Sequence, residues 1–283
     1  MELTDINTVK KLLSRYGFSF QKSLGQNFIT DPEVCPKMAE LAGVAPGTCA
    51  VEIGPGVGVL TVELAKRADR VVTIELDTRL IPVLAQTLYD YRNTEVINAD
   101  VLKTDLKKLI EEKFPGKTVN ICANLPYYIT SPIIMYLLQS SLPVDAVTVM
   151  VQKEAADRLC AKVGSRDSGA ITVAVNYYAE AEKLFEVKKD SFMPPPKVDS
   201  EVIRLKIRKK PPVEVEDERF FFDMVKAAFS QRRKTAVNGL ASGLGMPKEK
   251  ITAALERAGL SASVRAEALT MEELARLASE LKK

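Results

Sequence analysis

Apolar residues in the first half of the chain form short runs that end at turn-forming or acidic residues. The runs cover residues 50–53, 70–74, 94–99, 118–124 and 144–151. Each has the length of a strand and is rich in β-branched residues. Helical periodicity over residues 57–68 and 104–113 lies between them. This alternation predicts an α/β fold with an open, mostly parallel sheet.

The following segment is less regular. Residues 152–161 predict a helix, whereas residues 168–178 fit a period of two about as well as one face of a helix, so both remain open. Residues 184–187 and 198–207 predict a terminal antiparallel pair. The connector between them holds three consecutive prolines, residues 194–196, which make it stiff and extended. We therefore expect a Rossmann-like sheet with an antiparallel last strand.

The two ends of the chain are helical in pattern. Residues 4–15 place apolar side chains on one face, and residues 31–41 predict a second helix. Past a composition shift near residues 209–212 no strand pattern is evident. Helices are expected there over residues 219–230, 235–244, 247–258 and 271–282. The sequence thus predicts an α/β domain at 1–209 and a smaller all-α domain at 210–283.

Three alternate glycines, Gly54, Gly56 and Gly58, follow the first run. Glycine tolerates positive φ and lets a ligand approach the backbone, and the next helix presents free N–H groups. A dinucleotide loop would need a glycine at position 59, which is Val59. The E-x-G-x-G-x-G form that is present resembles the S-adenosylmethionine loop of class I methyltransferases. The plain alternative is a turn that only closes a strand–helix unit.

Two acids follow the next two runs: Glu75 ends the second and Asp100 the third. Ligands of open parallel sheets bind outside the carboxyl ends of the strands. An acid about 20 residues beyond a glycine loop commonly holds a ribose. We expect Glu75 to do so and Asp100 to accept a hydrogen bond from an adenine amino group.

The fourth run ends in the tetrapeptide NLPY at residues 124–127. Asn124 offers an amide oxygen, and Leu125 is held extended by the proline after it, which leaves its carbonyl free of a helical partner. Tyr127 adds a flat aromatic face. Two acceptors and a ring can hold the exocyclic amine of a planar base, as methylation of adenine N6 or cytosine N4 requires. A strand-to-helix turn with a buried tyrosine is the alternative.

Composition removes several kinds of chemistry. The 283 residues include no histidine, which excludes Ser-His-Asp and Cys-His catalysis and histidine-ligated metals. The four cysteines have no C-x-x-C spacing, so we expect buried free thiols and no metal site. No apolar run approaches 18 residues and the N-terminus does not resemble a signal peptide, so we expect a cytoplasmic protein with no membrane partner.

Basic residues gather between positions 188 and 210 and again at residues 232–234. Lysine and arginine neutralise phosphate, and arginine stacks on unpaired bases. The formal net charge of +3 is too small to decide for nucleic acid. On charge alone, an RNA-binding face and a solvated surface are equally good interpretations.

Taken together, these segments resemble the KsgA family, also called RsmA, of small-subunit rRNA adenine N6-dimethyltransferases. The matching segments are KSLGQNF at 22–28, VEIGPGVGVLT at 51–61, Glu75, AD at 99–100, NLPYYIT at 124–130, SFMPPPKVDS at 191–200 and AFSQRRKT at 228–235. The glycine loop alone is common to many methyltransferases, whereas the whole set is specific.

The resemblance implies roles for individual residues. Those implied to bind S-adenosylmethionine are Gln26, Asn27, Ile29, Gly54, Gly56, Glu75, Leu76, Asp100, Val101 and Asn124. Those implied to hold the target adenine are Asn124, Leu125, Pro126, Tyr127 and Phe192, with the two aromatic rings sandwiching the base. Those implied to contact RNA are Lys22, Lys197, Arg232, Arg233 and Lys234.

The implied activity is S-adenosylmethionine-dependent N6,N6-dimethylation of two adjacent adenosines. The target lies in the 3′-terminal hairpin loop of small-subunit (16S) rRNA, within an assembling 30S subunit. The all-α domain would dock RNA or ribosome, the protein is expected to be a monomer, and no metal is expected.

Four alternatives are weaker. An Erm-type methyltransferase of large-subunit rRNA shares most of these motifs. A DNA adenine methyltransferase would more typically carry D/N-P-P-Y, whereas position 125 is leucine. A non-catalytic RNA-binding assembly factor would not need the intact glycine loop. A dehydrogenase is disfavoured by Val59.

Overall fold

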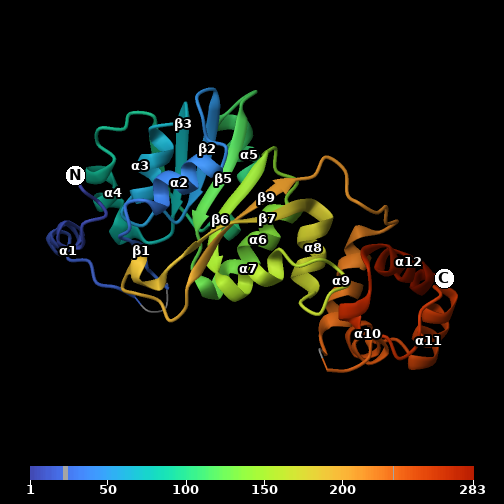
Figure 1. Cartoon of the computed structure of the whole chain (residues 1–283). Helices are drawn as coiled ribbons and strands as arrows, with labels where there is room; N and C mark the ends of the chain where they lie inside the picture. Colours follow the sequence, from blue (N-terminus) through green and yellow to red (C-terminus); the bar gives the residue numbers. More distant parts are fainter. Residues whose placement is uncertain (22–24, 232) are drawn as a thin grey trace. The chain divides into compact units, whose positions relative to one another are not determined.

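The computed structural model describes residues 1–21, 25–231 and 233–283 (Figure 1). The chain divides into two compact units. The first contains Met1–Ala156 and Glu182–Ile207, and the second contains Asp157–Ala181 and Arg208–Lys283. The division expected at 209/210 placed all of Asp157–Ala181 in the α/β domain, whereas this segment is grouped with the C-terminal helices.

The first unit is built on a seven-stranded sheet with the order β4-β3-β2-β5-β6-β9-β7. The strands are β2 Thr48–Ile53, β3 Arg70–Glu75, β4 Thr94–Asn98, β5 Thr118–Asn124, β6 Ala146–Gln152, β7 Ala179–Val187 and β9 Ser200–Ile207. β4, β3, β2, β5 and β6 are mutually parallel, and β9 is antiparallel to β6. The expected Rossmann-like sheet with an antiparallel strand near its end is confirmed.

The strand order reverses between β2 and β5, because the chain runs outward from β2 to β4 and then returns to β5 on the other side. Such a reversal leaves a crevice at the carboxyl ends of the two strands. β2 ends at Ile53, directly before the glycine loop, and β5 ends at Asn124, directly before Leu125. The topology therefore brings the two most distinctive sequence segments to one edge.

Helices flank or follow the strands. They are α1 Ile6–Arg15, α2 Val34–Leu41, α3 Val59–Ala65, α4 Ile81–Thr87, α5 Leu106–Lys113, α6 Thr130–Gln139 and α7 Lys153–Leu159. Asp5 caps the N-terminus of α1, where its carboxylate accepts a hydrogen bond from the Thr8 N–H at 2.6 Å. Within the described residues, no helix is long and apolar enough to cross a membrane.

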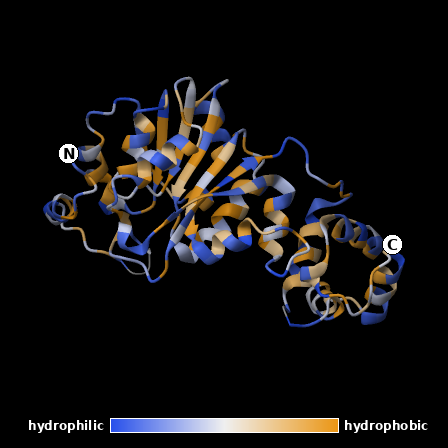
Figure 2. Cartoon of the chain, in the orientation of Figure 1, coloured by the Kyte–Doolittle hydropathy of each residue, from blue (hydrophilic) through white to orange (hydrophobic). Residues whose placement is uncertain are grey.

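The core follows from the alternation of side chains along the strands. Ala50 of β2, Cys122 of β5 and Met150 of β6 point to one face, where Met38 of α2 and Leu64 of α3 pack against them. Apolar residues accordingly concentrate in the central strands (Figure 2). Three of the four free cysteines are buried in this unit, as expected, and Cys160 is partly exposed.

A second, two-stranded sheet was not expected. β1, Phe28–Ile29, pairs antiparallel with β8, Phe192–Met193. The pairing joins the N-terminal KSLGQNF segment to the proline connector, where the Met193–Pro194 peptide bond is cis. Two segments that are far apart in the sequence thus share one short ladder.

The second unit contains the segment whose sequence pattern was ambiguous, and the structure makes it a helix. Its helices are α8 Ala170–Tyr178, α9 Glu218–Phe229, α10 Ala236–Leu244, α11 Lys248–Arg257 and α12 Met271–Lys282. Tyr177 of α8 packs against Phe221 and Phe222 of α9, with ring centroids 5.7 and 5.3 Å apart. Burial against α9 therefore decided between the two periodicities.

Close packing of α9 on α10 depends on two glycines. A Cβ built at Gly239 lies 2.6 Å from the carbonyl oxygen of Ala227, and one at Gly243 lies 2.5 Å from the Ala227 Cβ. Real side chains do not approach backbone atoms this closely, so the helices touch only because both positions lack a Cβ.

We expect Gly239→Ala to destabilise the protein by about 1–3 kcal/mol, because the overlap with the α9 backbone outweighs the helix propensity of about 1 kcal/mol that alanine adds. Urea denaturation of the full chain measures the change. Ser242→Ala, on the exposed side of the same helix, is the matched control and should stay within about 0.5 kcal/mol. A more stable Gly239→Ala protein would contradict this packing.

Candidate active site

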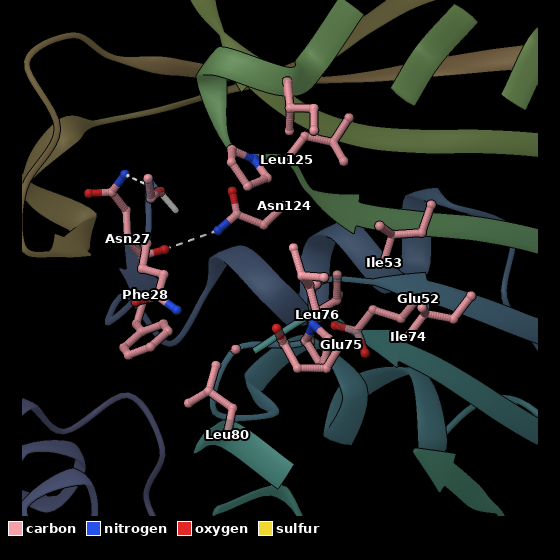
Figure 3. A pocket seen from close by; sticks show the side chains of 18 of the residues that line it. Asn27, Phe28, Glu52, Ile53, Ile74, Glu75, Leu76, Leu80, Asn124 and Leu125 are labelled. Atoms are coloured by element: carbon pink, nitrogen blue, oxygen red, sulfur yellow. Dashed lines mark hydrogen bonds between the residues drawn. The ribbon is translucent and has the colours of Figure 1, made fainter. Parts of the chain in front are cut away.

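The carboxyl ends of β2, β3, β4 and β5 open into one pocket (Figure 3). All residues expected to bind the cofactor or the target base line it: Gln26, Asn27, Ile29, Gly54, Gly56, Glu75, Leu76, Asp100, Val101, Asn124, Leu125, Pro126, Tyr127 and Phe192. Asn124 and Leu125 lie on one wall, and Glu75, Leu76 and Leu80 lie on the opposite one (Figure 3). The sheet edge thus brings together residues from six segments of the chain.

The glycine loop forms the floor between β2 and α3. Gly54, Gly56 and Gly58 all have positive φ, at 69°, 59° and 94°. A Cβ at Gly54 would meet nothing within 4 Å, so its backbone faces open space, whereas a Cβ at Gly56 would lie 3.0 Å from the Phe28 ring. The loop therefore exposes backbone to a ligand at one glycine and accepts an aromatic ring at the next.

Glu75 is 6% exposed at the end of β3. Burial raises the pKa of its carboxyl to about 7, against the opposing effect of backbone N–H groups from Asp77, Gly56 and Leu76. The Asp77 N–H donates to Glu75 Oε1 at 2.7 Å. One carboxylate oxygen is thereby held by the backbone.

Asp100 caps the turn after β4. Its Oδ1 accepts from the Leu102 N–H at 3.0 Å, and Lys103 Nζ lies 3.7 Å from its Oδ2. The side chain is 30% exposed and lines the pocket. Oδ2 therefore retains capacity to accept from a ligand.

Sequence reasoning assigned no role to Glu52, which is 1% exposed within β2 and lines the same pocket. The Thr61 hydroxyl donates to its Oε2 at 2.5 Å. Burial, reinforced by the nearby Glu75 carboxylate, raises the pKa of Glu52 to about 8. The spacing E-x₈-T links the end of β2 to the first turns of α3, and only the fold shows that both residues are buried.

Asn124 is oriented by the N-terminal segment. Its Nδ2 donates to the Asn27 carbonyl oxygen at 3.2 Å (Figure 3). Because a carbonyl only accepts, the amide nitrogen must be the atom that faces Asn27. The amide oxygen is left as an acceptor in the pocket.

Leu125 and Tyr127 complete the NLPY turn. The Leu125 N–H donates to the Met150 carbonyl at 3.2 Å, which ties the turn to β6. Among the described residues no donor reaches the Leu125 carbonyl oxygen. The Tyr127 hydroxyl shares a 2.8 Å hydrogen bond with Ser200 Oγ at the start of β9, and burial raises its pKa. The ring is therefore held at its far end.

The β1–β8 ladder forms the third wall. It places Ile29 opposite Phe192, and both side chains are almost completely buried, at 5% and 4% exposure. Phe192 packs with the core that contains Val34 and Met150. Phe192 is therefore held in place by strand pairing and packing, directly before the connector with the three prolines.

Gln26 lines the pocket, but its side chain bonds to protein. Its Nε2 donates to Asp77 Oδ2 at 2.8 Å, and its Oε1 accepts from the Gln21 N–H at 3.3 Å. Arg79 donates to the same carboxylate through Nε at 2.8 Å and Nη2 at 2.5 Å, and to the Ser19 carbonyl at 3.0 Å. This hydrogen-bonded group of Gln26, Asp77 and Arg79 was not expected from the sequence.

The residues expected to contact RNA are not in the pocket. Lys197 is exposed in the first unit, and Arg233 and Lys234 are exposed in the second. Lys22 and Arg232 lie outside the described residues. In the described part of the chain, no group of three or more histidine, cysteine, aspartate or glutamate residues has the arrangement of a metal site.

Comparison with known proteins agrees with this geometry. Residues 17–283 match the family described as ribosomal RNA adenine dimethylase. The ribosomal RNA small subunit methyltransferase A of Geobacillus thermodenitrificans is 51% identical over 276 residues, which cover 96% of this chain and 94% of that protein. The protein of the same name from Oceanobacillus iheyensis is 49% identical, over 95% and 93%.

The chain belongs to the ribosomal RNA adenine dimethylase family. This family is one of S-adenosylmethionine-dependent methyltransferases. Among solved structures, a dimethyladenosine transferase from Plasmodium falciparum matches this dimethylase with a TM-score of 0.72 and 28% identity, over 88% of this chain and 95% of that one. The 23S rRNA methyltransferase ErmE matches at 0.65 and 29%, over 90% and 100%.

The two buried carboxyls predict how the stability of this dimethylase depends on pH. The folded pKa values of Glu52 and Glu75 lie above the ordinary value of 4.5, so the protonated forms favour the folded state. Their contribution is complete below about pH 4.5 and is lost as pH rises through about 7 to 8.

We therefore expect Glu52→Gln to become more stable relative to wild type between pH 5 and 9, by roughly 2–4 kcal/mol. Glu75→Gln should show the same sign with a smaller change, because its pKa is raised less. Urea denaturation at pH 5, 7 and 9 without cofactor measures both. A Glu52→Gln gain that does not grow with pH would show that Glu52 is ionised in the fold.

Proposed function

We propose that this dimethylase transfers two methyl groups to N6 of each of two adjacent adenosines in the 3′-terminal hairpin loop of small-subunit rRNA, during assembly of the 30S subunit. The observation that carries this proposal is the Asn124 amide oxygen, turned into the pocket beside the glycine loop by the Asn27 carbonyl. The enzyme is proposed to act in the cytoplasm, where ribosomal subunits assemble. It is also proposed to act as a monomer.

The pocket residues fit S-adenosylmethionine. Glu75 supplies acceptors for the ribose hydroxyls, Asp100 an acceptor for the adenine amine, and Gly54 an open stretch of backbone. Leu76, at 52% exposure, and Val101 supply apolar surface for the adenine ring. Bound there, the cofactor supplies a methyl group already activated by a sulfonium.

The acceptor side needs a nitrogen lone pair. An adenine amine is a poor nucleophile because its lone pair is delocalised into the ring. Accepting its two N–H groups at the Asn124 oxygen and the Leu125 carbonyl favours a pyramidal nitrogen and concentrates the lone pair on the free side. Positioning and electrostatics then provide the acceleration, with no histidine required.

The target base must also leave its stack. Flipping costs a few kcal/mol, and one or two aromatic contacts return about 1–3 kcal/mol each. Tyr127 is suited to this role because its hydroxyl is fixed by Ser200 and its ring lines the pocket. Phe192 exposes only 4% of its surface, so it contributes an edge of the wall rather than a free face.

Basic residues outside the pocket are proposed to hold the RNA backbone. Lys197 stands on the connector that follows β8, and Arg233 and Lys234 stand between α9 and α10. Lys22 and Arg232 belong to the same proposed set by sequence. Because these residues are positively charged, the affinity of the enzyme for RNA would fall steeply as the salt concentration rises.

Methylation of ribosomal subunits tests the proposal. We expect labelled methyl groups to enter unmodified small subunits, with N6,N6-dimethyladenosine at two adjacent positions, and not protein-free large-subunit RNA. Label confined to the large-subunit RNA would mean activity of the kind named for ErmE, which resembles this fold at lower identity than the small-subunit relatives do. No label in either substrate would reject the proposed reaction.

Asn124→Ala should lower kcat by about 100-fold or more and leave the Kd for S-adenosylmethionine within a few-fold, because the contact strengthens as the amine becomes pyramidal. Single-turnover methylation and calorimetry measure the two quantities. Asn93→Ala is the control for loss of a partly buried amide, because the Asn93 side chain donates to backbone carbonyls outside the pocket. Unchanged turnover in Asn124→Ala would remove that residue from the mechanism.

A further inference from the structure

Tyr128 is an exposed aromatic residue at the pocket to which neither the sequence analysis nor the mechanism assigns a role. Its side chain is 57% exposed, although it lines the same pocket as Asn124. The large exposed hydrophobic residues of the described chain are Met1, Ile6, Phe20, Leu76, Tyr89, Tyr128 and Val198. Of these, Leu76 and Tyr128 line the pocket, and Leu76 is assigned to the cofactor.

The short 3₁₀ turn Tyr127–Ile129 sends the two tyrosines in different directions. Tyr127 is tied to Ser200 by its hydroxyl. Tyr128 lies instead against the N-terminal segment, where a Cβ built at Gly25 would be 3.3 Å from its Cδ1 and 3.5 Å from the Cβ of Pro126. Gly25 has positive φ, at 57°. The Tyr128 ring is thus supported along one edge and open to solvent elsewhere.

We propose that Tyr128 is a stacking platform for the nucleotide next to the target adenine. This inference rests on the proposed function, in which two neighbouring adenosines are modified. While one base occupies the pocket, the other is one nucleotide away and unpaired. Tyr128 follows Tyr127 in the chain and lines the same pocket while its side chain stays 57% exposed, so its ring offers an aromatic surface to a base just outside the pocket.

The chemistry of the ring favours a purine. A large exposed aromatic face is unfavourable in water, and stacking an unpaired base on it removes apolar surface from both partners. Every base has such a face, but stacking is strongest for purines.

The test is single-turnover methylation of unmodified small subunits by wild type, Tyr128→Phe and Tyr128→Ala. Tyr128→Ala should raise the KM for the subunit by roughly 5- to 100-fold, the equivalent of one stacked base. Tyr128→Phe should keep the wild-type KM. The Kd for S-adenosylmethionine should be unchanged in both variants, because the ring is assigned to RNA.

Tyr89→Ala is the matched control, because Tyr89 is 67% exposed, lies next to Arg92 and does not line the pocket. It should behave as wild type. A second substrate, subunits reconstituted with uridine in place of one of the two adenosines, isolates the contact. Wild type should have a higher KM for the uridine-substituted subunits than for unmodified subunits. Tyr128→Ala, which already lacks the stacking contact, should have nearly the same KM for both.

These measurements distinguish a failure of the Tyr128 stacking contact from a failure of the proposed methylation reaction. If wild type methylates small subunits and Tyr128→Ala has the same KM, the platform is rejected while the proposed function stands. If the alanine substitution and the uridine substitution have independent, additive effects, Tyr128 does not contact that base and the inference is wrong. If wild type methylates neither the unmodified nor the uridine-substituted small subunits, the proposed function is wrong and this inference is wrong with it.

Discussion

The dimethylase depends on one constraint of parallel sheets: strands that run the same way must end at the same edge. The chain exploits it at the point where strand order reverses between β2 and β5. The glycine loop after β2, Glu75 at the end of β3, Asp100 after β4 and Asn124 at the end of β5 are separated by tens of residues, yet they line one pocket. The other residues of the pocket lie around this edge of the sheet.

Much of this edge could be predicted, because its residues leave local signals. Buried parallel strands appear in the sequence as runs of β-branched residues. Alternate glycines indicate a turn with positive φ, which other residues adopt only with strain. The acids directly after β3 and β4 are visible for the same reason. Short-range periodicity and turn chemistry therefore located the pocket floor, both acids and the NLPY turn.

Other features have no local signal. β1 and β8 are each two residues long and lie far apart in the chain. A strand this short shows no alternation of apolar and polar residues, so the sequence does not predict the pairing. Residues 168–178 have a pattern that fits both a strand and a helix, and only the aromatic packing of Tyr177 on α9 decides it. Glu52 is visible in the sequence as the acid of the E-x-G-x-G-x-G motif, but its burial and its hydrogen bond to the buried Thr61 are known only from the fold.

The N-terminal segment at residues 25–29 connects two walls of the pocket. Its Asn27 carbonyl accepts a hydrogen bond from the Asn124 amide on one wall. On the other wall, Gln26 donates to Asp77, whose N–H in turn donates to Glu75. Both bonds come from adjacent residues of one short stretch, which is fixed on its other side by the β1–β8 ladder. One short stretch of chain therefore fixes the orientation of both the Asn124 amide and, through Asp77, the Glu75 carboxyl, which are side chains that end two different strands of the sheet.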